Sequence, residues 1–506
     1  MAKIERSKNA ITGTIWGGLE KAASILLPFI VRTVLIKKLG AEYLGLNGLF
    51  SSILQVINLT ELGFGAASVF AIYKTIAEDD YNTTGAILCY LRKIYRIIGF
   101  IIIGVGIITL PFLKYMISGH IPSDINIHIL YLIYIFNTSI SYLLFAHKRS
   151  LLMALQMNNI ISKIGFTTNV LMYAGQIFML LFTSNYYCYI VLMPLFTVIS
   201  NVCCSVIVDK RYKEWLNGTS LNPEIKKDIT KRLVPLMSTK IATVIVNAAD
   251  TLVISTFLGL SYVAVYNNYY YIMNSISGFI IVMYAAMQAG IGNALIVDPH
   301  EKVMSDFKRL CFINNWLVAF CTACLICLYQ PFMELWLGKE MMLPFGMVVL
   351  FGVYFYANNI WRVVVLYKDA AGIWREDMIR CYLSCFANLI LNIILVNYIG
   401  LYGVIGSSVL ANIMGLSWMG LILYRAVFKE SAKLFYLSEW KATIISGIVC
   451  VICWIICGFS PDGISGFFIR GVLCTISSNL LLWLFYHRDE TYKDASKWFV
   501  HKVMRR

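Results

Sequence analysis

Charged side chains inside an apolar run are the residues of this chain best suited to binding or transport chemistry. The run at residues 12–36 contains Glu20, Lys21 and Arg32. In a helix, Lys21 and Arg32 would point within about 20° of each other, about 16 Å apart along the axis. A charge at the centre of a bilayer costs about 3 kcal/mol or more, so it normally faces protein or water. We predict a cationic stripe for substrate binding, with Glu20 as an ion-coupling group or counter-ion. The alternative is that Arg32 reaches back to the membrane interface.

A second polar stripe runs along the apolar segment at 44–73. Ser51, Gln55 and Asn58 recur at helical spacing and share one face, which Glu61 continues. This pattern predicts a cavity in which Gln55 and Asn58 contact substrate, with Glu61 as an ion-coupling group or counter-ion. Hydrogen bonding to a neighbouring helix is the alternative.

The apolar segment at 234–258 contains Lys240, Asn247 and Asp250. If this segment and the one at 12–36 occupy equivalent places, Lys240 faces the same central space as Lys21 and Arg32. Clustered cations in a low-dielectric cavity attract an anion such as a pyrophosphate. Lys240 and Asn247 are therefore predicted to bind substrate. We interpret Asp250 as a counter-ion, and a proton or sodium site is the alternative.

The next apolar segment, at 264–294, begins with amide and tyrosine side chains. Asn267 and Asn268 lie within the sequence YNNYYY. Aromatic and amide groups together suit stacking on sugars and hydrogen bonding to them. We predict that both asparagines bind substrate, and an aromatic belt at the membrane interface is the alternative.

The sequence contains no catalytic constellation. It has no phosphate-binding loop, zinc-protease motif or nucleophile elbow. Two cysteine triplets have metal-like spacing: Cys321, Cys324, Cys327 and Cys450, Cys453, Cys457. Both lie in apolar runs without a nearby histidine or carboxylate, which favours packing over ligation. We predict no catalytic residue, no metal and no cofactor.

The composition of the chain indicates that these residues lie in a membrane protein. The chain has 506 residues, of which 59% are hydrophobic and 14% charged, whereas soluble domains are about 45–50% apolar and about 25% charged. Long apolar runs alternate with short basic stretches, as in helical membrane proteins, and the alternating pattern of a membrane barrel is missing. The predicted fold class is an all-α polytopic membrane protein.

Fourteen runs are long enough to cross the bilayer, which takes about 20 residues each. They lie at 12–36, 44–73, 94–113, 127–146, 164–184, 187–208, 234–258, 264–294, 310–330, 343–366, 379–398, 402–424, 442–459 and 466–486.

The basic residues between these runs predict the orientation of the chain. With a cytoplasmic N-terminus, 34 of the 42 Lys and Arg residues fall in inside segments or at the inner ends of spans, 5 fall outside or at an outer end, and 3 lie deeper within spans. This asymmetry follows the positive-inside rule, so both termini are predicted to be cytoplasmic. The net charge of +15 then reflects topology, and we expect no nucleic-acid partner.

The chain also repeats itself weakly. LGAEY at Leu39–Tyr43 and LGLSY at Leu258–Tyr262 are 219 residues apart, each before a long span. Parallel repeats are typical of transporters whose substrate path lies at the repeat interface. We predict six-helix bundles at 1–208 and 234–424, a cytoplasmic linker at 209–233, and two additional transmembrane helices with a basic tail at 425–506. The linker is either partly amphipathic or a plain tether.

Several short stretches then point to a family. They are GLNGLFSSI from Gly45, ELGFG from Glu61, DTLVIS from Asp250 with Tyr266-Asn267, LWLG from Leu335 and GLYGVIG from Gly400. In this order and spacing they resemble bacterial polysaccharide flippases, the Wzx-like members of the multidrug/oligosaccharidyl-lipid/polysaccharide (MOP) exporter superfamily. The resemblance covers nearly the whole chain.

The resemblance implies two six-helix bundles and two extra helices, with a central cavity that opens alternately to each side. It implies export of undecaprenyl-pyrophosphate-linked repeat units for capsule, O-antigen or exopolysaccharide. A polymerase and glycosyltransferases are the implied partners. The family's cationic cavity maps onto Lys21, Arg32 and Lys240 only through their positions in equivalent spans.

Three other functions stay open. A multidrug extruder for organic cations would favour an acidic cavity, whereas the spans hold three cations and three carboxylates. A lipid II flippase is closer in mechanism. A membrane-embedded polymerase or glycosyltransferase would need a sizeable outward domain, and the predicted outward loops are short.

Overall fold

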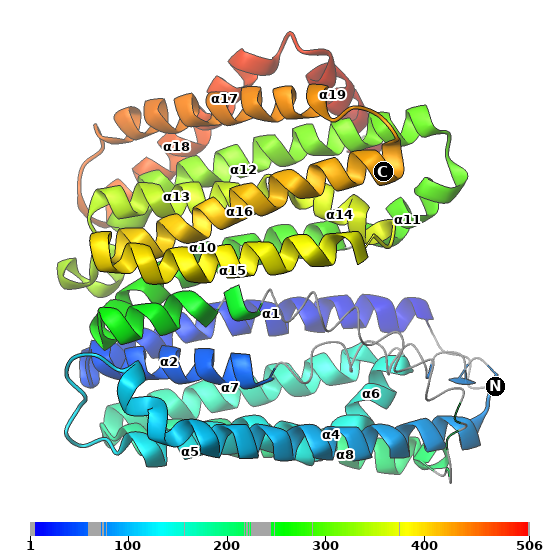
Figure 1. Cartoon of the computed structure of the whole chain (residues 1–506), viewed down its shortest axis with the longest axis vertical. Coiled ribbons are helices and arrows are strands. Elements are labelled where there is room, and N and C mark those ends of the chain that lie inside the picture. Colours follow the sequence, from blue (N-terminus) through cyan, green and yellow to red (C-terminus); the bar gives the residue numbers. More distant parts are fainter. Residues whose placement is uncertain are drawn as a thin grey trace. The chain divides into compact units, whose positions relative to one another are not determined.

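The computed structural model describes residues 6–58, 72, 75–76, 78–155, 157–216, 218, 221, 223, 244–246, 248–285, 287–373 and 375–503. Glu61, Lys240 and Asn247 lie outside these residues, as does most of the predicted linker. Every regular element in the described ranges is helical (Figure 1), which confirms the predicted all-α fold class.

The chain divides into two compact units, and the first covers residues 1–264. Its described helices are α1 (Arg6–Lys38), α2 (Ala41–Ile57), α4 (Tyr81–Thr109), α5 (Ile127–Leu143), α6 (Ala146–Ala154), α7 (Asn158–Phe182), α8 (Tyr186–Arg211) and a short apolar helix at Val244–Phe257.

The second unit covers residues 265–506, and α10 continues into it from the first unit. Its described helices are α10 (Leu260–Ala285), α11 (Gln288–Val297), α12 (His300–Leu337), α13 (Phe345–Asn359), α14 (Arg362–Ala370), α15 (Arg375–Ile399), α16 (Leu401–Leu423), α17 (Lys433–Cys457), α18 (Gly463–Tyr486) and α19 (Glu490–Val503). Within this unit α12 packs against α13, α17 and α18 (Figure 1).

The described helices agree with about fourteen membrane spans. Nine are long and apolar enough to cross a membrane, and two bent pairs, α5 with α6 and α10 with α11, raise the number to eleven. The other three predicted spans coincide with α1, α2 and Val244–Phe257. The outer faces are apolar, as hydrocarbon requires: on α15, Ile379, Leu383 and Phe386 recur at helical spacing and are exposed.

The two similar stretches LGAEY and LGLSY share one backbone feature. Gly40 and Gly259 end their helices at φ 115° and 100°, a left-handed conformation that glycine adopts without steric cost. The Gly40 N–H donates to Leu35 O, and the Gly259 N–H donates in the same way to Ile254 O. The 219-residue spacing therefore marks one helix-ending motif that is used twice.

The start of the predicted linker folds back onto α4. Lys213–Leu216 forms a 3₁₀ turn, and the Trp215 ring lies 4.2 Å from the Tyr81 ring, centroid to centroid. This contact fixes where the linker leaves the first unit. The boundaries predicted for the two bundles and the linker stay a prediction.

A buried ion cluster joins α14 to α15 in the second unit. Lys368 Nζ donates to Asp377 Oδ2 at 2.7 Å and also contacts Asp369 at 3.0 Å. Arg380 donates to both oxygens of Asp377, through Nε to Oδ1 and through Nη2 to Oδ2. The Asp377 side chain is 2% exposed. Its negative charge therefore compensates Lys368 and Arg380 away from water, and both of these cations are nearly buried.

Replacing Asp377 by Asn should destabilise this unit. The Asp377→Asn variant leaves Arg380 without a counter-charge and Lys368 with Asp369 alone. Breaking a buried pair on one side typically costs about 3–5 kcal/mol. We expect a clearly lower apparent melting temperature in detergent. Asp298→Asn is the matched control, because its partner Lys302 is 59% exposed and surface pairs contribute about 0–1 kcal/mol. Equal melting temperatures for the two variants would refute the structural role of the cluster.

Candidate functional site

The predicted polar face of α2 lines a cavity in the first unit. Gln55 and Asn58 face a space of about 390 Å³ together with Ser51 of the same helix and with Asn137 and Thr138 of α5. Asn58 Oδ1 is buried and accepts no hydrogen bond from the described residues. Amide and hydroxyl side chains thus line this cavity, and contact of Gln55 and Asn58 with a substrate stays a prediction.

A second, smaller cavity lies in the same unit. Glu20 of α1 lines a space of about 230 Å³ together with Arg149 of α6, Asn169 of α7 and Asn201 of α8. One carboxylate and one guanidinium share this space, so its formal charge is balanced. Glu20 thus shares a cavity with a cation, and its role as an ion-coupling group or counter-ion stays a prediction.

Hydrogen bonds between α5 and α8 connect the linings of the two cavities. Thr197 Oγ1, in the smaller cavity, donates to Asn137 Oδ1, in the larger one, at 2.9 Å. One turn further along, Asn201 Nδ2 donates to Ser141 O at 3.4 Å. These bonds fix the orientation of the lining side chains, so the polar interior of the unit is continuous and ordered.

The two cations predicted on α1 have different surroundings. Lys21 is exposed, whereas Arg32 is partly buried. Arg32 interacts electrostatically with Tyr173 of α7 and Tyr189 of α8. Their convergence with Lys240 on one central space stays a prediction.

The remaining predicted residues lie in both units. Asp250 is 2% exposed and belongs to the helix at Val244–Phe257, in the first unit. Asn267 is partly buried and Asn268 is fully buried on α10, in the second unit. The structure thus brings Gln55 and Asn58 into one cavity and Glu20 into its neighbour, whereas Glu61, Lys240 and Asn247 lie outside the described residues.

Sequence reasoning missed several lining residues although a signal was present. Asn137 and Ser141 on one helix, and Thr197 and Asn201 on another, each recur four residues apart in apolar segments. This is the spacing that predicted the stripe on α2. Arg149 is one of the basic residues in the segments predicted to face the inside. Nothing in its local sequence relates it to Glu20.

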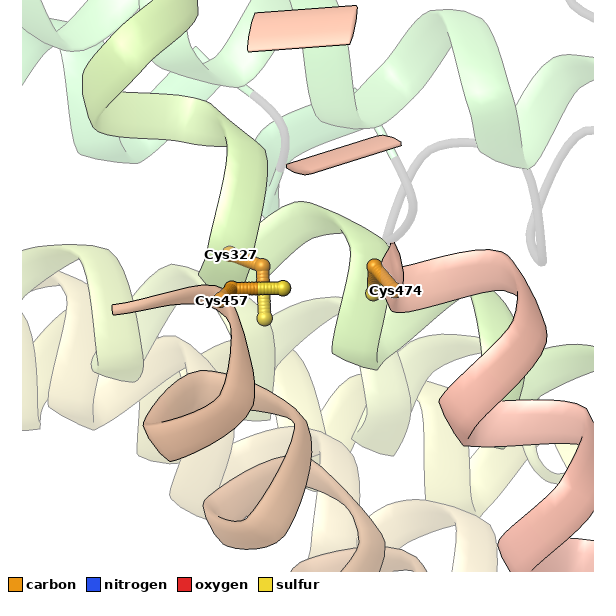
Figure 2. A group of neighbouring side chains, drawn as sticks. All are labelled: Cys327, Cys457 and Cys474. Carbon is orange, nitrogen blue, oxygen red and sulfur yellow. The ribbon is translucent and has the colours of Figure 1, made fainter. Parts of the chain in front are cut away.

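One cysteine of each sequence triplet meets a third cysteine in the second unit. Cys327 of α12, Cys457 of α17 and Cys474 of α18 have sulfur atoms within 4.8 Å of one another (Figure 2). Thiolates in such a group could hold a soft ion such as Cu(I). However, the surrounding cluster is apolar, including Ala319 and Leu482, so three thiolate charges would be desolvated at high cost. All fourteen cysteines are free, and the geometry favours packing.

The two cavities are suited to binding a neutral, hydroxyl-rich group. Amides offer both donors and acceptors, and serine and threonine hydroxyls do the same. The described lining contains amides, hydroxyls and the balanced pair Glu20 and Arg149. It contains no group arranged for nucleophilic or acid–base chemistry.

Comparison with known proteins identifies the family. A family model described as polysaccharide biosynthesis protein matches residues 10–289, more than half of the chain. A search of curated proteins found no match.

Three solved structures have a similar fold. The lipid II flippase MurJ in an inward closed conformation has a TM-score of 0.64 at 16% identity, over 94% of this chain and 99% of MurJ. An inward-facing MATE multidrug resistance transporter of the MOP superfamily has a TM-score of 0.62 at 19% identity, over 80% and 96%. A mutant of the Vibrio cholerae MATE transporter VcmN has a TM-score of 0.54 at 15% identity, over 84% and 98%. The chain therefore belongs to the polysaccharide biosynthesis protein family and shares the fold of these solved transporters.

Proposed function

We propose that the protein flips undecaprenyl-pyrophosphate-linked oligosaccharide repeat units from the cytoplasmic to the outer leaflet of a bacterial cell membrane by alternating access. The exported glycan would serve capsule, O-antigen or exopolysaccharide synthesis. The family match supports a role in polysaccharide biosynthesis. The observation that carries the choice of a glycan is the amide- and hydroxyl-lined interior of the first unit.

The side chains that line this interior favour a glycan over an organic cation as substrate. A cation needs an excess of buried negative charge, because desolvation has to be offset by an opposite charge. In the smaller cavity the carboxylate Glu20 is accompanied by Arg149, and the residues that line the larger one are uncharged. Neutral donors and acceptors suit sugar hydroxyls, so the multidrug-extruder alternative is less well supported. Lipid II also carries sugars on a pyrophosphate lipid, so the lipid II flippase stays the nearest alternative.

The pyrophosphate is assigned to the cationic residues. In this proposal Lys21, Arg32 and Lys240 hold it, while Asn247, Asn267 and Asn268 contact the glycan. Asp250 and Glu61 serve as counter-ions or ion-coupling groups. Membrane-embedded synthesis is not proposed, because the described lining lacks a catalytic arrangement. A polymerase and glycosyltransferases would act before and after the protein.

Removing the cations should impair export. We expect Lys21→Gln, Arg32→Gln and Lys240→Gln to reduce surface polysaccharide severely when combined, because the pyrophosphate loses its charge partners. Arg32→Lys should keep part of the activity. Lys339→Gln is the control, since its side chain is 82% exposed and lies in a predicted outward loop. Full export by the triple variant, at an equal amount of protein in the membrane, would contradict the assignment.

The larger cavity can be tested through its amide lining. Asn137→Leu removes the acceptor of Thr197 and fills the cavity, so we expect export to slow by roughly tenfold, about the value of one buried hydrogen bond. Met193→Leu is the matched control, because Met193 lines the same cavity and the substitution conserves volume and polarity. Equal export rates for the two variants would mean that the substrate does not enter this cavity.

The proposed orientation predicts labelling from opposite sides. Cysteines introduced at Lys210 and Ser261, both exposed positions, should react with an impermeant maleimide from the cytoplasmic and the outer side respectively. Cys89, Cys188 and Cys203 are exposed and should first be replaced by serine. Labelling of both positions from one side would overturn the topology.

A further inference from the structure

A buried carboxyl near the start of α17 has chemistry that the proposed transport path does not use. Glu439 is 5% exposed. It faces α12, where Asn315 Nδ2 donates to Glu439 Oε1 at 3.1 Å. The other carboxyl oxygen, Glu439 Oε2, and the amide oxygen, Asn315 Oδ1, are buried and have no hydrogen-bond partner among the described residues.

This pattern lacks one donor. An ionised carboxylate and an amide oxygen both only accept hydrogen bonds. Two buried acceptors without a donor are costly, and a buried charge without a partner is more costly still. One proton on Oε2 removes all three costs, because the acid O–H can donate to the amide oxygen while the amide N–H donates to Oε1. The acid and the amide then form a cyclic pair with two hydrogen bonds.

The charged and titratable groups around Glu439 supply no competing partner. A cavity of about 260 Å³ adjoins the pair. Lys441, the cation nearest in sequence, contacts Asp489 at 2.8 Å. None of the ion pairs among the described residues includes Glu439. The groups that line the cavity or interact with Glu439 are Lys308 and Cys311 of α12, Tyr356 of α13, Tyr424 and Glu430 near the end of α16, Lys441 of α17, and Tyr486 and Asp489 at the end of α18.

The same pair joins two helices. Asn315 lies between Asn314, whose Nδ2 donates to Asn359 O and Ile360 O, and Trp316, whose Nε1 donates to Asn479 Oδ1 at 2.9 Å. These three consecutive residues connect α12 to α13, α17 and α18. The connection to α17 is the one whose hydrogen bonding changes with a single proton.

We propose that Glu439 and Asn315 form a proton-binding site that joins α12 to α17. In the protonated state the two helices are held by two hydrogen bonds. When the proton leaves through the adjoining cavity, the carboxylate and the amide oxygen repel each other and the joint weakens. The ligand is a proton, because the geometry needs one hydrogen-bond donor between two acceptors.

The first test is an infrared pH titration of the full-length protein in lipid nanodiscs. The ordinary pKa of a glutamate is about 4.3. At about pH 7 the wild type should nevertheless show the carbonyl band of a protonated carboxylic acid. This band should disappear in Glu439→Gln and persist in Glu430→Gln. Glu430 lines the same cavity but its side chain is 53% exposed, so it is the matched control. Absence of the band in the wild type, or its persistence in Glu439→Gln, would overturn the proposal.

The second test follows thermal stability against pH. The wild type should lose stability as pH rises toward about 9, since deprotonation removes the donor from the folded state. Glu439→Gln carries a permanent N–H donor in the same place, so this part of the slope should vanish. Wild-type spectra are also recorded with sodium replaced by choline. If the acid band is lost when sodium is added at constant pH, a metal cation displaces the proton, which would contradict a site whose ligand is a proton alone.

Discussion

A side chain with hydrogen-bonding groups inside a bilayer has to find its partner in the protein, because lipid offers neither donors nor acceptors. This constraint shapes both units. In the second, α12 uses Asn314, Asn315 and Trp316 to bond three neighbouring helices. In the first, α5 and α8 are joined by Asn137 and Thr197. Polar groups that are left over after such pairing are therefore informative, and Asn58 Oδ1 and Glu439 Oε2 are two of them.

The helices could be predicted because apolar length is a local property of the sequence. The similarity of LGAEY and LGLSY has a local cause, because Gly40 and Gly259 both adopt positive φ at helix ends. Gln55 and Asn58 could be assigned to a cavity because helical spacing alone places them on one face. The helices and the face of α2 could be predicted because each depends on residues within a few turns of each other.

The site residues that could not be predicted from the sequence depend on contacts between distant segments. Helix packing alone brings Arg149 into the cavity that Glu20 lines and Cys474 close to Cys327 and Cys457. Glu439 and Asn315 are separated by 124 residues. The prediction that Lys21 and Arg32 form one stripe could not anticipate their different surroundings: Lys21 is exposed, whereas Arg32 is partly buried and interacts electrostatically with Tyr173 and Tyr189.

The central claim is that the protein moves a pyrophosphate-linked glycan across a bilayer. It is tested most directly in vesicles that contain the purified protein and a lipid-linked pyrophosphoryl oligosaccharide with a fluorescent sugar. An impermeant reductant that quenches only outward-facing label reports the movement. We expect protein-dependent loss of the protected fluorescence, with little effect for an organic-cation substrate assayed in parallel. Protection equal to that of protein-free vesicles, or transport of the organic cation alone, would contradict the account.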